Sequence, residues 1–259
     1  MNNSELKKIA YDLIKTTELA GSKSVELQKK GLKIITKPDN TPVSNGDIEV
    51  NEILTKKIEQ LTPNIPIVSE ETVDLKKKNT FDTYWLIDPI DGTREYIAGK
   101  DDYTLNAALI VNKRPAVGII GVPKKNRLFY SYGKNNSFMI ENKQKIKLNC
   151  EKKTPTGEVF GLTNDVNPPQ DILNKLKEFG MTSFKKLSCS YKYCVIATGE
   201  FDVYVDKVRA REWDDAAGQA IAEHAGAIVT NLDGEYFEYG KEDYINPTIL
   251  IRRSKDLNV

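Results

Sequence analysis

Residues 85–93 of this 259-residue chain read Trp-Leu-Ile-Asp-Pro-Ile-Asp-Gly-Thr. A short apolar strand therefore ends in two carboxylates, Asp88 and Asp91, in a turn. Pro89 stiffens this turn, and Gly92 permits a backbone conformation that other residues rarely adopt. The pattern predicts a buried strand that presents two acidic side chains at its end. Both could equally be ordinary turn and helix-capping residues, and this stretch alone leaves that alternative open.

The turn offers oxygen ligands only. It can aim both carboxylates and the Ile90 carbonyl at one point, and such a ligand set suits a hard cation, Mg²⁺ before Zn²⁺. If a helix begins near Gly92 and Thr93, its free N–H groups and the positive end of its dipole can hold a phosphate oxygen.

Two further acidic segments strengthen the metal interpretation. Glu70 and Glu71 follow an apolar run, where a buried carboxylate is costly unless it is paired or bound to a metal. Asp214 and Asp215 stand in Glu-Trp-Asp-Asp-Ala-Ala-Gly at the predicted start of a helix. Capping of that helix by Asp214 is the alternative to a metal-ligand role.

Composition excludes several classes of protein. The 38 Lys and Arg against 37 Asp and Glu give a charge of +1, which provides no general attraction to nucleic acid or anionic membranes. The single histidine, His224, excludes a multi-histidine zinc site, and we expect it to be partly buried or capping. Three cysteines without a Cys-x-x-Cys pair favour a reducing compartment, and no apolar run is long enough to span a bilayer. We therefore expect a cytoplasmic protein without integral membrane contact.

The periodicity of apolar residues predicts a layered α/β protein. Helices are expected at 4–20 (ending at Gly21), 47–61, 169–179, 190–199 (capped by Ser190) and 213–225. Strands are expected at 65–69 and 83–87, three within 104–132, and then at 158–163, 184–187, 201–205 and 248–252. Hairpins are expected at Asn142 and at Asp233-Gly234. The first half is rich in antiparallel strands and the second alternates strands with helices, which indicates two parts, 1–150 and 151–259, of one structural unit.

Taken together, the motifs resemble those of the Mg²⁺-dependent, lithium-sensitive phosphatases of the inositol monophosphatase superfamily, over nearly the whole chain. They occur in that family's order: Lys37-Pro-Asp-Asn-Thr-Pro-Val-Ser44 followed by Asp47, Val68-Ser-Glu70-Glu71, Asp88-Pro-Ile-Asp91-Gly-Thr93 and Trp213-Asp214-Asp215-Ala-Ala-Gly218. Within the superfamily the chain is most similar to the bacterial 3'(2'),5'-bisphosphate nucleotidases. The segments that carry this similarity are Ser69-Glu-Glu71, Arg94-Glu-Tyr-Ile97, Tyr103-Thr-Leu-Asn106 and Ser190-Tyr-Lys192-Tyr-Cys194 with Gly199.

The resemblance implies an αβαβα sandwich and a set of roles. Most metal ligands would come from residues 1–150, with Asp214 and the substrate contacts from 151–259. One Mg²⁺ would be held by Glu70, Asp88 and the Ile90 carbonyl, a second by Asp88, Asp91 and Asp214, and the family's pattern allows a third, weaker ion near Glu70. The proton of the attacking water would pass to the pair Asp47 and Thr93, while the phosphate would be held by the backbone of Gly92 and Thr93.

The substrate side departs from the family's pattern. The segment Val205-Asp-Lys207-Val-Arg209-Ala-Arg211 stands where the nucleotidases have an Arg-Phe-Gly-Pro-like stretch, and inositol phosphatases have an acidic residue near Lys207. Lys207, Arg209 and Arg211 would suit a second phosphate, which favours a bisphosphate substrate, although an exposed basic strand edge is the alternative. Ser190 and Lys192 are the other expected substrate contacts. Cys189 replaces an expected serine, which puts any hydrogen bond from that position in doubt.

The sequence therefore predicts a metal-dependent phosphomonoesterase. The expected reaction removes the 3'-phosphate of adenosine 3',5'-bisphosphate by in-line attack of a metal-activated water, which would clear a by-product of sulfate assimilation and sulfate transfer. The same chemistry on inositol monophosphate or a sugar bisphosphate is one alternative, and a catalytically weak nucleotide or Mg²⁺ sensor is another. The expected partner is a small phosphate ester rather than a nucleic acid polymer, and the protein is expected to be a monomer or a homodimer.

Overall fold

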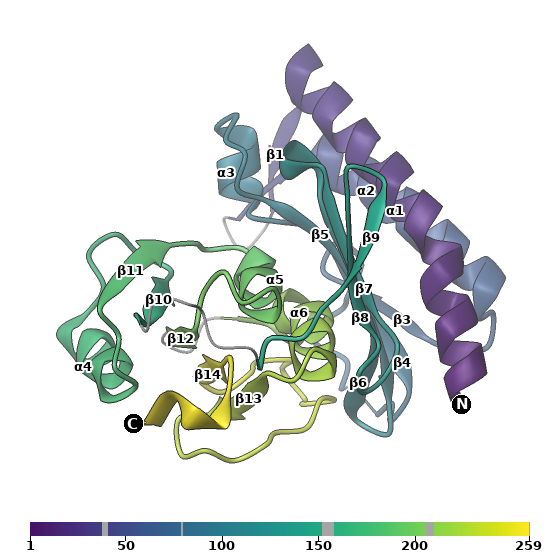
Figure 1. Cartoon of the computed structure of the whole chain (residues 1–259). Helices are drawn as coiled ribbons and strands as arrows, with labels where there is room; N and C mark the ends of the chain where they lie inside the picture. The colour runs from purple at the N-terminus through teal and green to yellow at the C-terminus, as the bar shows by residue number, and fades with distance from the viewer. Residues whose placement is uncertain (38–40, 79, 152–157, 206–209, 259) are drawn as a thin grey trace.

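Helices and sheets alternate in five layers, as Figure 1 shows nearly edge-on. This computed structural model describes residues 1–37, 41–78, 80–151, 158–205 and 210–258. From one side to the other the layers are two long helices, a seven-stranded sheet, a central helix pair, a five-stranded sheet and an outer helix. The predicted αβαβα sandwich is confirmed.

The seven-stranded sheet follows chain order, β3-β4-β5-β6-β7-β8-β9. Its first pair is parallel and every later pair is antiparallel, so the antiparallel first half is confirmed. The strands are β3 (Ile67–Ser69), β4 (Tyr84–Asp91), β5 (Thr104–Val111), β6 (Arg114–Val122), β7 (Arg127–Ser131), β8 (Ser137–Glu141) and β9 (Gln144–Lys147). A separate two-stranded hairpin is formed by β1 (Ile34–Thr36) and β2 (Pro42–Ser44).

The five-stranded sheet does not follow chain order. Its order is β11-β10-β12-β14-β13, with parallel pairing of β10 to β11 and β12, and antiparallel pairing of β14 to β12 and β13. The strands are β10 (Phe160–Thr163), β11 (Ser183–Lys186), β12 (Val203–Val205), β13 (Ile228–Asn231) and β14 (Ile249–Arg252). The division of the chain into two parts, 1–150 and 151–259, of one structural unit stays a prediction.

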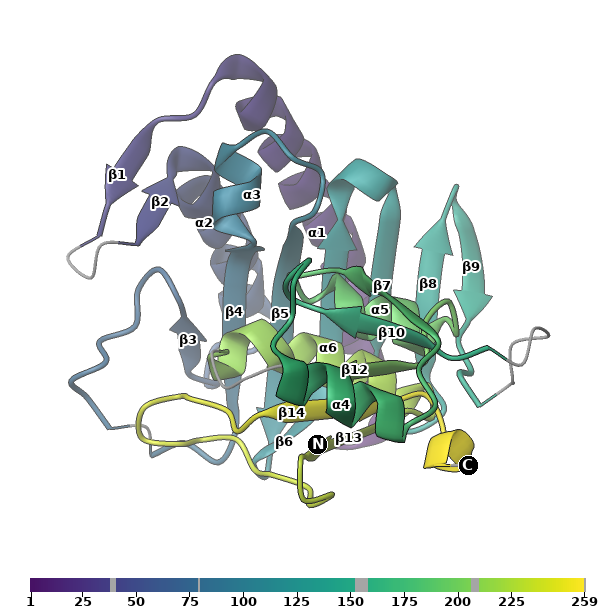
Figure 2. The same ribbon diagram turned by 90° about the vertical axis from the view of Figure 1, so that its left-hand side faces the viewer.

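The helices cover both faces of the large sheet. Helices α1 (Asn3–Lys30) and α2 (Asn45–Leu61) lie on one face, and α6 (Glu212–His224) lies on the other. In Figure 2, α6 crosses in front of the large sheet and α4 (Gln170–Glu178) lies outermost on the second sheet. Helix α5 (Tyr191–Ala197) packs on α6, while the short α3 (Thr93–Ile97) follows β4. Two 3-10 turns, η1 (Pro123–Lys125) and η2 (Lys255–Asn258), complete the elements.

Two expected boundaries are wrong for identifiable reasons. Gly21 does not end α1 but lies inside it, where an added Cβ would come within 3.1 Å of the Pro123 side chain, so this glycine lets the helix pack closely on η1. The helix ends instead at Gly31, which has φ +94°. Asp233-Gly234 does form a turn, but no strand pairs across it; β13 pairs with β14, which follows a connection of residues 232–248. None of the described helices is long and apolar enough to cross a membrane.

Candidate active site

Strand β4 extends further along the motif of residues 85–93 than the apolar run predicts. It continues to Asp91 instead of ending at residue 87, because Asp88 and Asp91 still pair with β5, with a register irregularity between them. Pro89 lies within this irregularity and cannot donate a ladder hydrogen bond. Gly92 then turns the chain into α3 at φ +95°, and its α-carbon lies so close to the next segment that a Cβ would be 3.0 Å from the Asp102 carbonyl. The motif therefore combines a strand irregularity with a glycine turn.

Three carboxylates converge at this turn. Oxygens of Glu70, Asp88 and Asp214 all lie within 4.8 Å of one another. Glu70 is brought beside β4 because its N–H continues the β3–β4 pairing to the Ile87 carbonyl at 3.0 Å, and Asp214 comes from the first turn of α6. Residues distant in the sequence thus form one acidic cluster.

The electrostatics of this cluster favour a cation. Burial, with the charges of Glu70, Asp91 and Asp214, raises the pKa of Asp88 well above its usual value. Burial and Asp91 do the same to the pKa of Asp214, and burial raises the pKa of Glu70 although Lys37 opposes it. Among the described residues, Asp88 Oδ1 is buried without a hydrogen-bond partner. A divalent cation would satisfy this oxygen and relieve the repulsion, so the donor set fits Mg²⁺.

Asp91 is not part of that three-carboxylate cluster and has its own partner. Its Oδ2 accepts the backbone N–H of Ser190 at 2.5 Å and lies 2.5 Å from the Ser190 hydroxyl. That hydroxyl also contacts the Asp214 carbonyl and accepts the Asn106 side-chain amide at 2.9 Å. Ser190 occupies the N-cap position of α5, as predicted, but its side chain makes no capping hydrogen bond. Its buried hydroxyl instead links β4, β5 and α6.

Asp47 and Thr93 form the expected pair. The Thr93 hydroxyl lies 3.2 Å from Asp47 Oδ1 and 3.0 Å from the Ile90 carbonyl oxygen. The other Asp47 oxygen accepts the N–H and hydroxyl of Ser44 at 2.8 and 2.6 Å, in the capping box that starts α2. Burial raises the pKa of Asp47, although these hydrogen bonds oppose the effect. The arrangement places a buried proton acceptor next to a hydroxyl at the β4 turn.

Sequence reasoning missed the position of Lys37. Its Nζ lies 2.9 Å from Glu71 and 3.5 Å from Glu70, beside the acidic cluster. Burial raises the pKa of Glu71 to about 7, against the opposing effect of Lys37. The signal for this contact was present, because Lys37 opens the first of the family-like motifs.

The predicted capping role of Asp214 is confirmed, and its metal-ligand role stays a prediction that its position allows. Its Oδ2 accepts the Arg211 N–H at 2.8 Å and so caps α6, while the acidic cluster includes a carboxylate oxygen of the same side chain. The neighbouring Asp215 is buried and accepts hydrogen bonds from Tyr193 and Asn246 at 2.9 and 2.8 Å.

A pocket of about 140 Å³ adjoins the cluster. Its lining residues are Asp91, Asn164, Ser188, Lys192, Tyr204, Ala210, Asp214, Asp215, Pro247 and Ile249. Lys192 is 4% exposed, and among the described residues no carboxylate or other acceptor bonds its Nζ, which lies 5.2 Å from the centre of the Tyr204 ring. Burial acts to lower the pKa of Lys192, but Tyr204, Asp215 and Asp91 outweigh it and the net pKa is raised. Lys207 and Arg209 lie outside the described residues.

The partly buried His224 ends α6, as expected, and the three cysteines are buried free thiols. His224 Nδ1 accepts the Gly133 N–H at 3.1 Å, and burial lowers the pKa of the ring to about 4. His224 lies at the end of α6 opposite Asp214, and it takes no part in the acidic cluster.

Comparison with known proteins gives a consistent result. A model of the Inositol monophosphatase family matches residues 2–257. The 3'(2'),5'-bisphosphate nucleotidase CysQ of Escherichia coli strain K12 is 30% identical over 220 residues, covering 84% of this chain and 88% of that protein.

Solved structures show the same fold. CysQ from Bacteroides thetaiotaomicron, described as a bacterial member of the inositol monophosphatase family, has a TM-score of 0.76 at 24% identity and covers 95% of this chain and 97% of its own. An IMPase/NADP phosphatase solved with Mg²⁺ and phosphate has a TM-score of 0.77 at 17% identity. The match covers 97% of this chain and 91% of that chain. The family model and these relatives span nearly the whole chain, which therefore belongs to the inositol monophosphatase family and is a phosphatase.

Proposed function

We propose that this phosphatase removes the 3'-phosphate of adenosine 3',5'-bisphosphate, giving AMP and inorganic phosphate, with Mg²⁺ as its cofactor. Similarity to CysQ over most of the chain supports the substrate. The observation that carries the proposal is the buried Lys192 ammonium, which lines a pocket beside the acidic cluster and makes no hydrogen bond or ion pair to a carboxylate of the described residues. A substrate with a second anionic group would supply that partner.

The proposed metal ligands are those implied by the family's motifs. Glu70, Asp88 and the Ile90 carbonyl would hold one ion, and Asp88 would share the second with Asp91 and Asp214. A third, weaker ion near Glu70 is part of the proposal. The chemistry that Mg²⁺ supplies when bound is positive charge at the attacking and leaving oxygens of an in-line displacement.

The protein's own groups perform the remaining tasks. Asp47 accepts a proton through the Thr93 hydroxyl, and the 3.2 Å hydrogen bond between the two side chains supports this role. The backbone N–H groups of Gly92 and Thr93 hold the phosphate. A water oxygen forms a bond to phosphorus as the bond from phosphorus to the 3'-oxygen breaks. The water gives up a proton through Thr93 to Asp47, and the 3'-oxygen takes up a proton from solvent and leaves as a hydroxyl, so the number of protons is unchanged.

Substrate contacts complete the proposal. Lys192 would hold the second phosphate, together with Lys207 and Arg209, while Ser190 would act at the boundary between pocket and metal site. The buried free cysteines fit the reducing cytoplasm in which we place the enzyme.

The test is phosphate release with Mg²⁺, with and without Li⁺, from adenosine 3',5'-bisphosphate, inositol 1-phosphate and fructose 1,6-bisphosphate. We expect lithium-sensitive release with the highest kcat/KM for the nucleotide. Asp88→Asn purified in parallel is the control for contaminating phosphatases. A preference for either other substrate would contradict the substrate assignment, and release from none of them would favour a sensor.

A further inference from the structure

The connection between β13 and β14, residues 232–248, lies against the residues that lead into α6. The Glu212 N–H donates to the Tyr244 carbonyl at 2.7 Å, and the Asn246 N–H donates to the Ala210 carbonyl at 3.1 Å. Arg211 and Ile245 form an isolated antiparallel bridge between these two bonds. The connection therefore pairs, like a short strand, with the three residues that precede Trp213 and Asp214.

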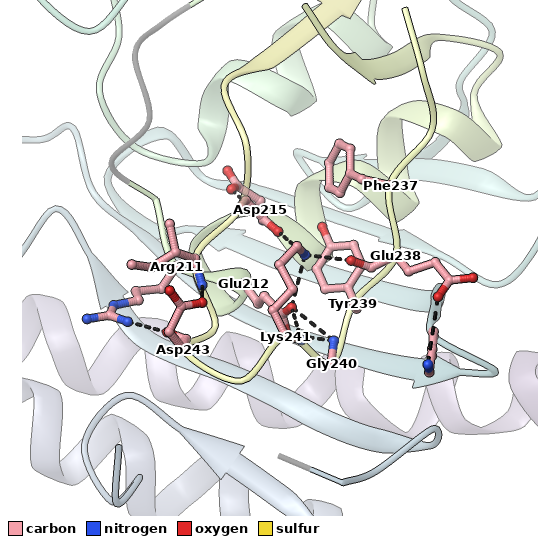
Figure 3. Close-up of polar contacts among 12 residues, drawn as sticks. Arg211, Glu212, Asp215, Phe237, Glu238, Tyr239, Gly240, Lys241 and Asp243 are labelled. Carbon is pink, nitrogen blue, oxygen red and sulfur yellow. Dashed lines mark hydrogen bonds and ion pairs between the residues drawn. The ribbon is translucent and has the colours of Figure 1, made fainter. Parts of the chain in front are cut away.

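Glu212 anchors this pairing with a buried carboxylate, which Figure 3 shows beside Gly240 and Lys241. Its oxygens accept the N–H groups of Gly240 and Lys241, each at 2.9 Å, and the Lys241 ammonium at 3.1 Å. The Tyr84 hydroxyl on β4 donates to the same carboxylate at 2.8 Å. Glu212 is 0% exposed, and a buried carboxylate is stable only while it keeps such partners.

Lys241 is linked to residues that flank Asp214 in the sequence on both sides. Besides Glu212, its Nζ contacts the Asn246 side-chain oxygen at 2.9 Å and the Glu238 carbonyl at 2.5 Å. The Asn246 amide in turn donates to Asp215 Oδ2 at 2.8 Å. The chain of contacts from Lys241 therefore reaches Glu212, two residues before Asp214, and Asp215, one residue after it.

The Asp214 carboxylate is also positioned by the residues just before α6, which pair with the connection. Its Oδ2 accepts the N–H of Arg211, the residue that the connection holds by the bridge to Ile245. Tyr244, which offers its carbonyl to Glu212, has φ +57°, a strained conformation for a residue with a side chain. Such a conformation persists where surrounding contacts enforce it, so this part of the connection is held firmly in place.

We propose that Glu212 and Lys241 are a positioning pair that fixes Asp214 within the acidic cluster, and so sets the affinity of the enzyme for Mg²⁺. The inference rests on the metal site of the proposed function. Neither residue contacts the cluster itself; Glu212 acts through the connection that pairs with Arg211, and Lys241 acts through Asn246 on Asp215.

The experiment measures Mg²⁺ binding to the full-length chain by calorimetric titration with MgCl₂ alone. Lys241→Met removes the cation and should raise the Mg²⁺ dissociation constant by about tenfold or more, the usual range for residues that orient metal ligands. Lys241→Arg keeps the charge and should recover part of the affinity. Lys78→Met is the matched control, because Lys78 pairs with Glu242 on the same connection at 2.9 Å but both side chains are exposed, and its Mg²⁺ affinity should equal that of the wild type.

A purely structural role predicts a different result. Leu176→Ala, a cavity variant in the outermost helix α4, should lower Tm without changing Mg²⁺ affinity, because Leu176 is 0% exposed and belongs to a core between α4 and the second sheet that includes no residue of the acidic cluster. If Lys241→Met behaves in the same way, the proposal is wrong. If it does not fold, Glu212→Gln with Lys241→Met leaves no unpaired buried charge, and wild-type Mg²⁺ affinity in that double variant would overturn the inference.

Asp214→Asn distinguishes failure of the positioning pair from failure of the metal site. Loss of Mg²⁺ affinity in Asp214→Asn, with wild-type affinity in Lys241→Met, would refute the positioning pair and leave the metal site intact. Unchanged affinity in Asp214→Asn would refute the metal site on which the inference rests.

Discussion

Asp88 is the residue at which stability and function conflict most directly. Its side chain is 2% exposed, one of its oxygens has no hydrogen-bond partner among the described residues, and Glu70 and Asp214 carry like charges beside it. Without a cation the cluster repels itself, and the protein keeps the arrangement only because other packing offsets the cost.

Asp88→Asn should therefore separate the two properties. We expect turnover to fall at least about a hundredfold, because a shared metal ligand is lost. In EDTA the variant should melt at the same temperature as the wild type or higher, because one of the repelling charges is gone. Steady-state kinetics and calorimetry in EDTA check both; near-normal turnover would disprove the ligand assignment.

His224 gives a prediction about pH. Burial lowers its pKa to about 4, so the unfolded chain, with an ordinary histidine, binds more protons than the folded protein between about pH 4 and pH 6.5. Stability should therefore fall as the pH decreases through this window, by about 1–2 kcal/mol from pH 7 to pH 5. Urea unfolding of wild type and His224→Asn at several pH values measures the effect. His224→Asn keeps an acceptor for Gly133 without a titrating ring, and an equal slope in both proteins would exclude His224 as the cause.

At the scale of elements, the packing of α6 on the large sheet depends on small residues. Gly118 on β6 lies under α6, where an added Cβ would be 2.4 Å from the Ala217 carbonyl and 2.9 Å from the Ala220 Cβ. Ala216, Ala217 and Ala220 are each at most 1% exposed, so neither element has room to yield.

Gly118→Ala should destabilise the fold by about 1–3 kcal/mol, the usual cost of overpacking a core. Ala116→Gly, at a partly exposed position in the same strand, is the control and should cost less than about 1 kcal/mol. Denaturant unfolding measures both. Equal stabilities of Gly118→Ala and the wild type would show that α6 can move away from β6.

Elements with strong periodicity could be predicted from the sequence, but their ends could not. The spacing of apolar residues predicts a helix at 47–61. Both ends of this range lie within two residues of the observed ends of α2, Asn45–Leu61. Gly21 alone predicts a helix end, because local propensity does not include the contact with Pro123, against which the helix packs. Asp233-Gly234 alone predicts a hairpin, because the sequence does not reveal that β14 takes the pairing position beside β13.

The site was predictable to the same limited extent. The acidic motifs indicated Glu70, Asp88 and Asp214, which the structure brings together. The buried network that supports Asp214 could not be predicted, because Lys241 and Asn246 stand in no recognisable motif and meet α6 only through tertiary pairing.

At the scale of the whole molecule, the acidic cluster joins the two halves of the chain. Glu70 follows β3 and Asp88 lies on β4 of the seven-stranded sheet, and Asp214 comes from the helix between the two sheets. A cation bound there binds the folded protein and not the unfolded chain, and so stabilises the whole fold.

Mg²⁺ at about a hundred times its dissociation constant should add about 2.7 kcal/mol of stability, raising Tm by roughly 5–10 °C for a protein of this size. Scanning calorimetry in EDTA and in MgCl₂ measures the shift. Asp88→Asn is the control and should show little of it. A wild-type Tm that is independent of Mg²⁺ would contradict the proposed metal site.

The position of β14 has a consequence for how the chain is made. Strands β3 to β9 can each join the edge of the sheet as they leave the ribosome, because their spatial order is their chain order. In the second sheet, β12 and β13 emerge before the strand that must lie between them. The nascent chain therefore carries strand edges with unpaired N–H and C=O groups until residues 249–252 follow, and in that interval it is most open to edge-to-edge association with another copy.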